Sequence, residues 1–149
     1  MNNIKIRPYQ SMHWEKVCDL HDKARPLELA GSCDPLAFIS LKEDEVDLDD
    51  FHASTKFVAY IRSELVGFVG VRELQVSWLY VDPEYFGLGV GRGLLQKALD
   101  CLERPAEIHV LSENVRAIGL YESVGFVLKS RFPSDVNGYP CTILKYVKW

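Results

Sequence analysis

Apolar positions recur at helical spacing in the first part of the chain. Positions 14, 17, 18, 21 and 24 form one face of an expected amphipathic helix. Residues 4–7 alternate and predict a short strand before it. We expect Ser11 to cap the helix and Pro26 to end or kink it. The pattern over residues 34–52 is less regular and predicts only short helical turns.

A strand pattern replaces the helical one from residue 57 onward. The runs 57–61, 65–73 and 75–81 are separated only by short turns, one of them at Ser63-Glu64, and therefore predict an antiparallel meander. The rest of the chain alternates between helix and strand and closes with a hairpin around Asn137-Gly138. Its expected elements are helix 94–102, strand 107–111, helix 115–123, and strands 126–132 and 139–147. The resulting order is βα(α)βββαβαββ.

Length and composition indicate one ordinary globular domain over residues 1–149. The chain has 48% hydrophobic and 26% charged residues, which is typical of proteins with a packed core. It begins without an apolar signal segment, and no run approaches the roughly 18 apolar residues of a membrane helix, so we expect a cytoplasmic protein with no membrane partner. A net charge of −4 argues against nucleic acid as a partner, because binding it normally needs a basic face. Monomer and homodimer both remain open.

The cysteines are scattered along the chain. They are Cys18, Cys33, Cys101 and Cys141, and no two form a C-x-x-C pair. This spacing argues against a zinc site, and we expect no bound metal. Since it offers no disulfide framework either, we expect reduced and mostly buried thiols.

Six carboxylates crowd into residues 43–50. Most runs of this kind are solvated surface. The alternative is that they raise the local concentration of a cationic amine near a binding cleft. The sequence leaves both interpretations open.

Four glycines at alternate positions, from Gly87 to Gly93, separate the strand pattern at 78–81 from the helix pattern at 94–102. Because glycine lacks a Cβ atom, its backbone amides can approach a ligand closely, and a following helix adds about half a positive charge. Two nucleotide motifs fail here. The Gly-Lys-Ser/Thr triplet of a P-loop is absent, and Arg92 stands where a dinucleotide fingerprint needs its third glycine. The loop therefore predicts another kind of phosphate ester.

Two segments together resemble the GCN5-related N-acetyltransferase (GNAT) family. Residues 79–95 are similar to its acetyl-CoA pyrophosphate loop, in which Arg/Gln-x-x-Gly-x-Gly/Ala opens a helix after a strand ending in Val-Asp-Pro. Residues 114–126 resemble its downstream motif, an Asn before a short helix that carries Ala and Tyr and ends in Gly-Phe. The resemblance implies an α/β (α+β) fold with a mixed, mostly antiparallel sheet and helices on both faces. It also implies an enzyme that transfers the acetyl group of acetyl-CoA to a primary amine by direct attack on the thioester.

The same resemblance assigns the cofactor contacts. The strands on either side of the loop part in this family, so main-chain groups of Leu79, Tyr80 and Val81 would hold pantetheine and the acetyl carbonyl. Asn114 would hydrogen-bond the cofactor, cap its helix, or do both. The amides expected on the pyrophosphate are those of Gly87, Leu88, Gly89, Val90, Gly91 and Arg92.

Three side chains in the segments that resemble the family affect the charge and the chemistry of the expected site. The family uses a tyrosine at the place of Tyr121 to protonate the leaving thiolate, and we expect Tyr121 to bind the cofactor in that role. Phe86 departs from the family pattern, which has Arg or Gln there. Arg92 is a candidate for supplying the missing charge.

Three candidates remain open for the base that takes the proton of the amine. A lysine-like amine has a pKa of about 10.4, so removing its proton at pH 7 costs roughly 4.6 kcal/mol. By analogy with family members, the candidates are Glu73, His109 and a water chain. His109 stands at the place of a base in members that modify ribosomal-protein N-termini.

The acceptor also remains open. The acidic run favours a small cationic amine, whereas His109 favours a peptide amine. Aromatic residues either line an acceptor pocket or belong to the core, and the candidates are Trp14, Trp78, Tyr80 and Tyr139. The alternative function is a non-catalytic acyl-CoA-binding module with a regulatory role.

Overall fold

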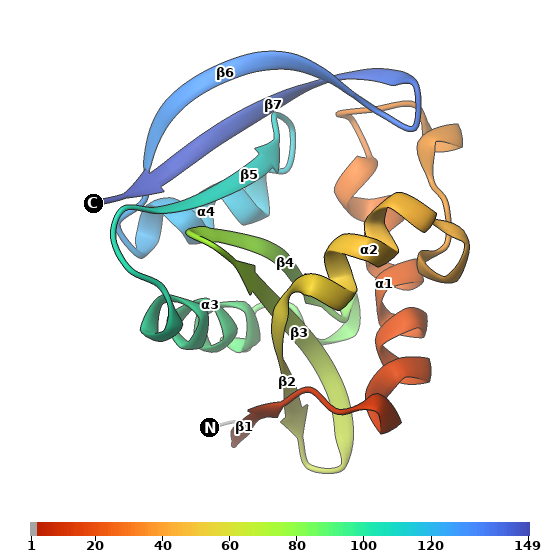
Figure 1. The fold of residues 1–149 in the computed structure, drawn as a ribbon, viewed down its shortest axis with the longest axis vertical. Helices are drawn as coiled ribbons and strands as arrows, with labels where there is room; N and C mark the ends of the chain where they lie inside the picture. The colour runs from red at the N-terminus through yellow and green to blue at the C-terminus, as the bar shows by residue number, and fades with distance from the viewer. Residues whose placement is uncertain (1–2) are drawn as a thin grey trace.

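Residues 3–149 are described by the computed structural model, which is built around one seven-stranded sheet (Figure 1). In sheet order the strands are β1 (Ile4–Pro8), β2 (Thr55–Ile61), β3 (Glu64–Arg72), β4 (Gln75–Val81), β5 (Ala106–Leu111), β7 (Tyr139–Lys148) and β6 (Val127–Val136). Neighbouring strands are antiparallel except β4 and β5, which run parallel. The sheet is therefore mixed and mostly antiparallel, as predicted.

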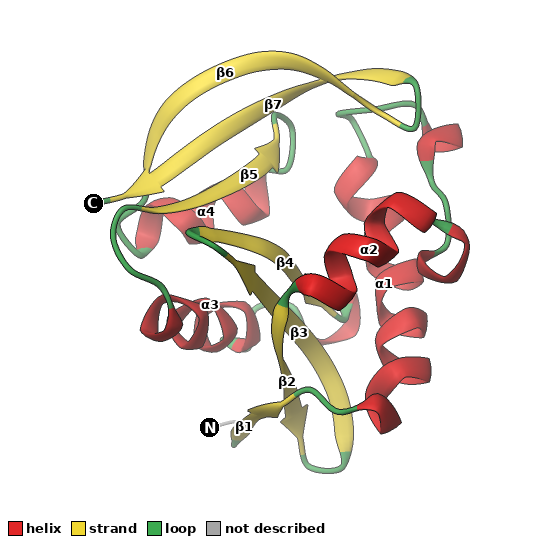
Figure 2. Cartoon of the chain, viewed as in Figure 1, coloured by secondary structure: helices red, strands yellow, loops and turns green. Residues whose placement is uncertain are grey.

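The described residues form four α-helices, which cover both faces of the sheet (Figure 2). These are α1 (Trp14–Leu29), α2 (Glu45–Ala53), α3 (Val90–Cys101) and α4 (Val115–Ser123). Residues of α1 and α2 share one apolar cluster with the sheet, and residues of α3 and α4 share another. This arrangement confirms the expected element order and the α+β class. Within residues 3–149, each helix is too short or too polar to cross a membrane.

Strand β4 contributes side chains to both layers of helices. Leu79 packs against the cluster under α3 and α4, and Val81 does the same. Trp78 and Tyr80 belong to the cluster under α1 and α2, because successive side chains of a strand point to opposite faces. The end of β4 is thus in contact with elements from both sides of the sheet.

Strands β4 and β5 pair over a very short length. Their register contains only Gln75 with Glu107 and Val76 with Ile108. Beyond these pairs the strands part, and the described part of β5 offers the backbone of residues 79–81 no ladder partner. The expected separation of the two strands is therefore present, at the end of β4 that leads into the glycine loop.

Helix α1 differs from the prediction at both ends. Ser11 does not cap it but opens a short 3₁₀ turn, in which the Gln10 amide donates to His13 Nδ1. Pro26 lies inside the helix, which continues to Leu29. The last turn persists because Leu29 is buried and the Ala30 amide donates to the Pro26 carbonyl. The helix therefore loses only the hydrogen bond that the proline nitrogen cannot donate.

The hairpins follow the predicted order with shifted boundaries. The β2–β3 turn lies at Arg62-Ser63, where Arg62 has a positive φ, rather than at Ser63-Glu64. The closing hairpin turns at Asn137-Gly138 as expected, and both residues have positive φ.

All four cysteines are free. Cys18 and Cys141 are buried, so the expectation of mostly buried thiols holds for two of the four.

Candidate functional site

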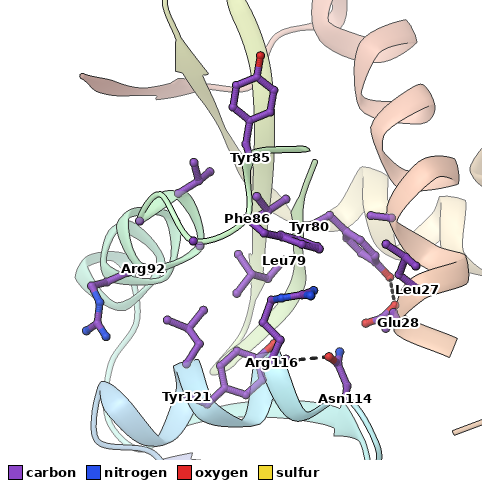
Figure 3. Close-up of a pocket in the computed structure, with 18 residues that line it drawn as sticks. Leu27, Glu28, Leu79, Tyr80, Tyr85, Phe86, Arg92, Asn114, Arg116 and Tyr121 are labelled. Atoms are coloured by element: carbon purple, nitrogen blue, oxygen red, sulfur yellow. Dashed lines mark hydrogen bonds between the residues drawn. The ribbon is translucent and has the colours of Figure 1, made fainter. Parts of the chain in front are cut away.

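A cavity of about 330 Å³ opens where β4 ends and parts from β5 (Figure 3). Its walls are the end of β4, the glycine loop, the start of α3, helix α4 and the last two turns of α1. All the residues expected to contact the cofactor line this cavity except Leu88. The side chain of Leu88 lies instead beside the β2–β3 turn. The structure thus brings together two segments that are about 25 positions apart in the sequence.

The glycine loop has a backbone that only glycine adopts easily. Gly87 has a φ of +78°, and Gly89, the N-cap of α3, has a φ of +89°. Gly91 allows the Leu120 side chain to approach the loop closely. A Cβ atom at position 91 would lie only 3.1 Å from Leu120 Cδ2. The Gly93 amide is bonded to the Gly89 carbonyl, while the amides of the first turn of a helix lack intrahelical partners. The loop therefore directs free N–H groups and the positive end of α3 toward the cavity.

Arg116, rather than Arg92, is the arginine whose side chain reaches the loop. Its guanidinium carbon lies 3.5 Å from the centre of the Phe86 ring, and both side chains line the cavity. The Arg92 side chain extends away from Phe86 and donates to Ser123 Oγ at 2.7 Å (Figure 3). The cation beside Phe86 therefore comes from α4, and Arg92 as the compensating charge stays a prediction.

Tyr121 is buried and lines the cavity from α4. Burial raises the pKa of the Tyr121 phenol, and the negative charge of Glu28 raises it further. A phenol in this environment keeps its proton at neutral pH and acts as a hydrogen-bond donor.

Asn114 occupies the N-cap of α4. Its Oδ1 accepts a hydrogen bond from the Ala117 amide at 3.4 Å. The side-chain NH₂ group retains its donor capacity, since capping uses only the oxygen. Asn114 also lines the cavity, so its position is compatible with both roles considered for it.

Glu28 is a cavity residue that the sequence analysis missed. It lies on the turn of α1 beyond Pro26, where the helix was expected to end or kink. Glu28 Oε1 accepts a hydrogen bond from the Tyr80 hydroxyl at 2.7 Å and another from the Arg25 guanidinium. Burial raises the pKa of Tyr80, so its hydroxyl remains a donor. The helical periodicity of α1 was the sequence signal for Glu28. The predicted helix was ended or kinked at Pro26, so this signal was not followed as far as Glu28.

Neither side chain considered as the base lies at the cavity. Glu73 sits in the exposed turn between β3 and β4, with a φ of +56°, at the opposite end of β4 from the glycine loop. His109 is exposed on β5, and its ring packs 5.8 Å from that of Phe132. The structure therefore does not bring Glu73 or His109 to Tyr121.

The acidic run divides between structural and exposed carboxylates. Asp44 caps α2 through the Asp47 amide at 3.1 Å, and Asp50 accepts from Trp78 Nε1 at 2.7 Å. Burial, together with repulsion from Asp44, raises the pKa of Asp47 to about 6. The remaining members, Glu43, Glu45 and Asp49, are exposed.

Among the aromatic residues considered for an acceptor pocket, only Tyr80 lines the cavity. Trp14 and Trp78 pack against Phe51, with ring centres 5.4 and 5.5 Å away. Tyr139 belongs to a separate apolar cluster near the end of α1. Trp78 is buried, whereas Trp14 and Tyr139 are half-buried and pack against the apolar clusters.

Comparisons with known proteins agree on one family. Residues 52–128 match the model of the acetyltransferase (GNAT) domain. The chain is 35% identical over 88 residues to the peptidyl-lysine N-acetyltransferase YjaB of Escherichia coli, a match that spans 58% of this chain and 59% of YjaB. A GCN5-related N-acetyltransferase structure from Rhodopseudomonas palustris superposes with a TM-score of 0.87 and 19% identity, covering 99% of this chain and 96% of the other. Salmonella typhimurium yncA, solved with acetyl-CoA, superposes with a TM-score of 0.71 and 18% identity over 97% and 93% of the two chains.

Proposed function

The chain belongs to the GCN5-related N-acetyltransferase family, and we propose that it transfers the acetyl group of acetyl-CoA to a primary amine. The observation that carries this proposal is one cavity that combines three features. These are the free amides of the glycine loop, the unpaired edge of β4 and the buried phenol of Tyr121. The first two suit the phosphate and amide groups of a CoA thioester, and the third suits its sulfur.

The cavity residues fit acetyl-CoA as the donor. Amides of residues 87–92 would hold the pyrophosphate at the positive end of α3. The backbone of residues 79–81 would pair with the amides of pantetheine and polarise the acetyl carbonyl. Arg116, stacked on Phe86, supplies a cation for the phosphates in place of the Arg or Gln of the family pattern. The Asn114 NH₂ group is a further donor. Acetyl-CoA bound to the structural neighbour yncA supports this donor.

Tyr121 is proposed as the acid of the reaction. As the amine nitrogen bonds to the carbonyl carbon, the C–S bond breaks and the sulfur leaves as a thiolate. A phenol that stays protonated at neutral pH can donate its proton to that sulfur, and the raised pKa of Tyr121 supports this state.

The proposed acceptor is a primary amine on a peptide or on a small cationic molecule. YjaB is a peptidyl-lysine N-acetyltransferase by name, and a lysine side chain is a cationic primary amine. The exposed carboxylates of the acidic run would favour the approach of such a cation by raising its local concentration.

The test is CoA release, measured with a thiol reagent, when the protein is given acetyl-CoA and one of three amines. The amines are a peptide with blocked ends and a single lysine, a peptide with a free N-terminus, and spermidine. We expect at least one to raise CoA release above hydrolysis without amine. Acetyl-CoA binding by calorimetry, with no release for any amine, would instead favour the non-catalytic binding module.

A further inference from the structure

Glu28 has a distinct position among the cavity residues. Within residues 3–149 it is the only carboxylate that lines the cavity. It enters from the end of α1, whereas Tyr121 enters from α4 (Figure 3). A proton acceptor and a proton donor therefore reach one cavity from two different walls.

The carboxylate of Glu28 is held by one oxygen and open at the other. Oε1 accepts from the Tyr80 hydroxyl at 2.7 Å and from Arg25. Oε2 receives no hydrogen bond from the part of the chain that the structure describes, although a carboxylate oxygen has lone pairs for at least one. Because the Tyr80 ring is packed against Phe68 and His21, with centres 5.5 and 5.1 Å away, the carboxylate is anchored to a rigid support. Oε2 is thus a fixed acceptor on the cavity wall.

We infer that Glu28 binds the acceptor amine and takes its proton, an inference that rests on the proposed function. The ammonium first loses one proton to solvent, and a remaining N–H of the neutral amine donates to Oε2. The nitrogen lone pair then bonds to the acetyl carbon, the C–S bond breaks, and the amine proton passes to Oε2 while Tyr121 protonates the sulfur. Glu28 later releases the proton to solvent, and Tyr121 regains one.

The chemistry of a carboxylate decides how Glu28 acts. A carboxylate accepts hydrogen bonds from an ammonium group, but it is a far weaker base than a free amine. Proton transfer therefore takes place as the N–C bond forms, because the nitrogen then becomes acidic. A primary amine retains an N–H for Oε2 after it has attacked, whereas a tertiary amine does not. Arg25 and Tyr80 are positioning residues in this account.

The decisive comparison is Glu28→Gln against Glu103→Gln, which changes an exposed carboxylate outside the cavity. For the three amines named above, we expect kcat/KM of E28Q to fall about 100-fold or more, in the range of a lost acid–base group. Acetyl-CoA affinity, measured by calorimetry, should stay within about twofold of wild type in both variants, since the fold is kept. Wild-type kcat/KM in E28Q would overturn the inference, as would an equal loss of acetyl-CoA binding.

A binding measurement tests the role of Glu28 without relying on catalytic turnover. The lysine peptide is titrated into protein saturated with CoA, and E28Q should bind it about tenfold more weakly than wild type or E103Q, as expected for one lost charged hydrogen bond. Should E28Q fail to fold, Tyr80→Phe retains the ring but frees Oε1, and we expect a lower kcat/KM at unchanged acetyl-CoA affinity. Wild-type protein that releases no CoA with any amine would defeat the proposed function. Peptide binding unaffected by E28Q would defeat the role of Glu28 alone.

Discussion

The Tyr80 hydroxyl donates a hydrogen bond of 2.7 Å to Glu28 Oε1, which links the strand before the glycine loop to the last turn of α1. Tyr80 can therefore serve both substrates of the proposed reaction. Its main chain lies on the unpaired edge of β4, and its side chain orients the carboxylate proposed to bind the amine. A shift of β4 on binding the donor would move that carboxylate as well.

Replacement of Tyr121 by Phe tests the proposed acid. We expect kcat to fall about 100-fold, because the leaving thiolate loses its proton donor, while acetyl-CoA affinity changes less than about twofold. Tyr146→Phe is the matched control, since Tyr146 is also buried but donates to Glu122 outside the cavity. Steady-state kinetics and calorimetry on both variants provide the measurement. Equal kcat in the two variants would remove Tyr121 from the mechanism.

The pH profile gives a second test of Tyr121. Burial and the charge of Glu28 raise its pKa above the ordinary value of 10.0. An acid is active in its protonated form, so ionisation of Tyr121 should not lower kcat between about pH 8 and pH 10. The measurement is kcat across this range. A decline in wild type that vanishes in Tyr121→Phe would contradict the raised pKa.

Arg116 should contribute to acetyl-CoA affinity, whereas Arg92 should not. We expect Arg116→Gln to raise the Kd of acetyl-CoA about tenfold, since it removes one charged contact to phosphate. Arg92→Gln is the control, because that side chain is bonded to Ser123 and extends away from Phe86. Its Kd should stay within about twofold of wild type. Similar affinities for the two variants, measured by calorimetry, would show that Arg116 is an ordinary surface arginine.

The sequence predicted those parts of the site that local backbone geometry determines. The glycines, Asn114 and Tyr121 were found because each is fixed by a short motif within one loop or one helix. Glu28 and Arg116 depend on contacts between segments far apart, such as the 52 positions that separate Glu28 from Tyr80. No periodicity in a single chain reveals contacts of this kind.

Glu73 and His109 failed to reach the cavity for two different geometric reasons. A strand rises about 3.3 Å per residue, so the seven residues of β4 separate Glu73 from the glycine loop by roughly 20 Å. His109 alternates with Ile108 and Val110, which pack in the cluster under α3 and α4, and so its side chain points to the other face. A motif identifies the strand on or near which a residue lies. The position of the residue along that strand, and the face of the sheet to which its side chain points, determine which residues it contacts.

Gly89 should be required for its backbone conformation. Its φ of +89° is unfavourable for alanine, whereas an added Cβ would meet only Ile4 Cδ1 at 3.9 Å. We therefore expect Gly89→Ala to lower the free energy of unfolding by about 1–2 kcal/mol and to weaken acetyl-CoA binding. Gly119→Ala in α4 meets no atom within 4 Å and should stabilise the protein by about 0.5–1 kcal/mol. Urea unfolding of both variants measures this contrast, and a stable Gly89→Ala would argue against a constrained loop.

Asp47 should make stability depend on pH in the weakly acidic range. Its pKa is raised from 3.8 to about 6 by burial and by repulsion from Asp44, against the opposing charge of Arg25. The unfolded chain regains the ordinary value, so between about pH 4 and pH 6 the folded state holds a proton that the unfolded state has released. The contribution of Asp47 to the free energy of unfolding therefore falls as pH rises through this window, and its ionised form is destabilising above it.

Asp47→Asn removes that charge and should stabilise the protein at pH 7. With partial solvent screening taken into account, we expect a gain of about 1 kcal/mol in the free energy of unfolding. The gain should shrink as pH falls from 6 toward 4, because the wild-type carboxyl then regains its proton in the folded state. Asp49→Asn, at an exposed position of the same helix, should change stability by less than about 0.5 kcal/mol. Urea unfolding at several pH values measures both variants, and a destabilised Asp47→Asn at pH 7 would mean that the charge is needed to hold Arg25.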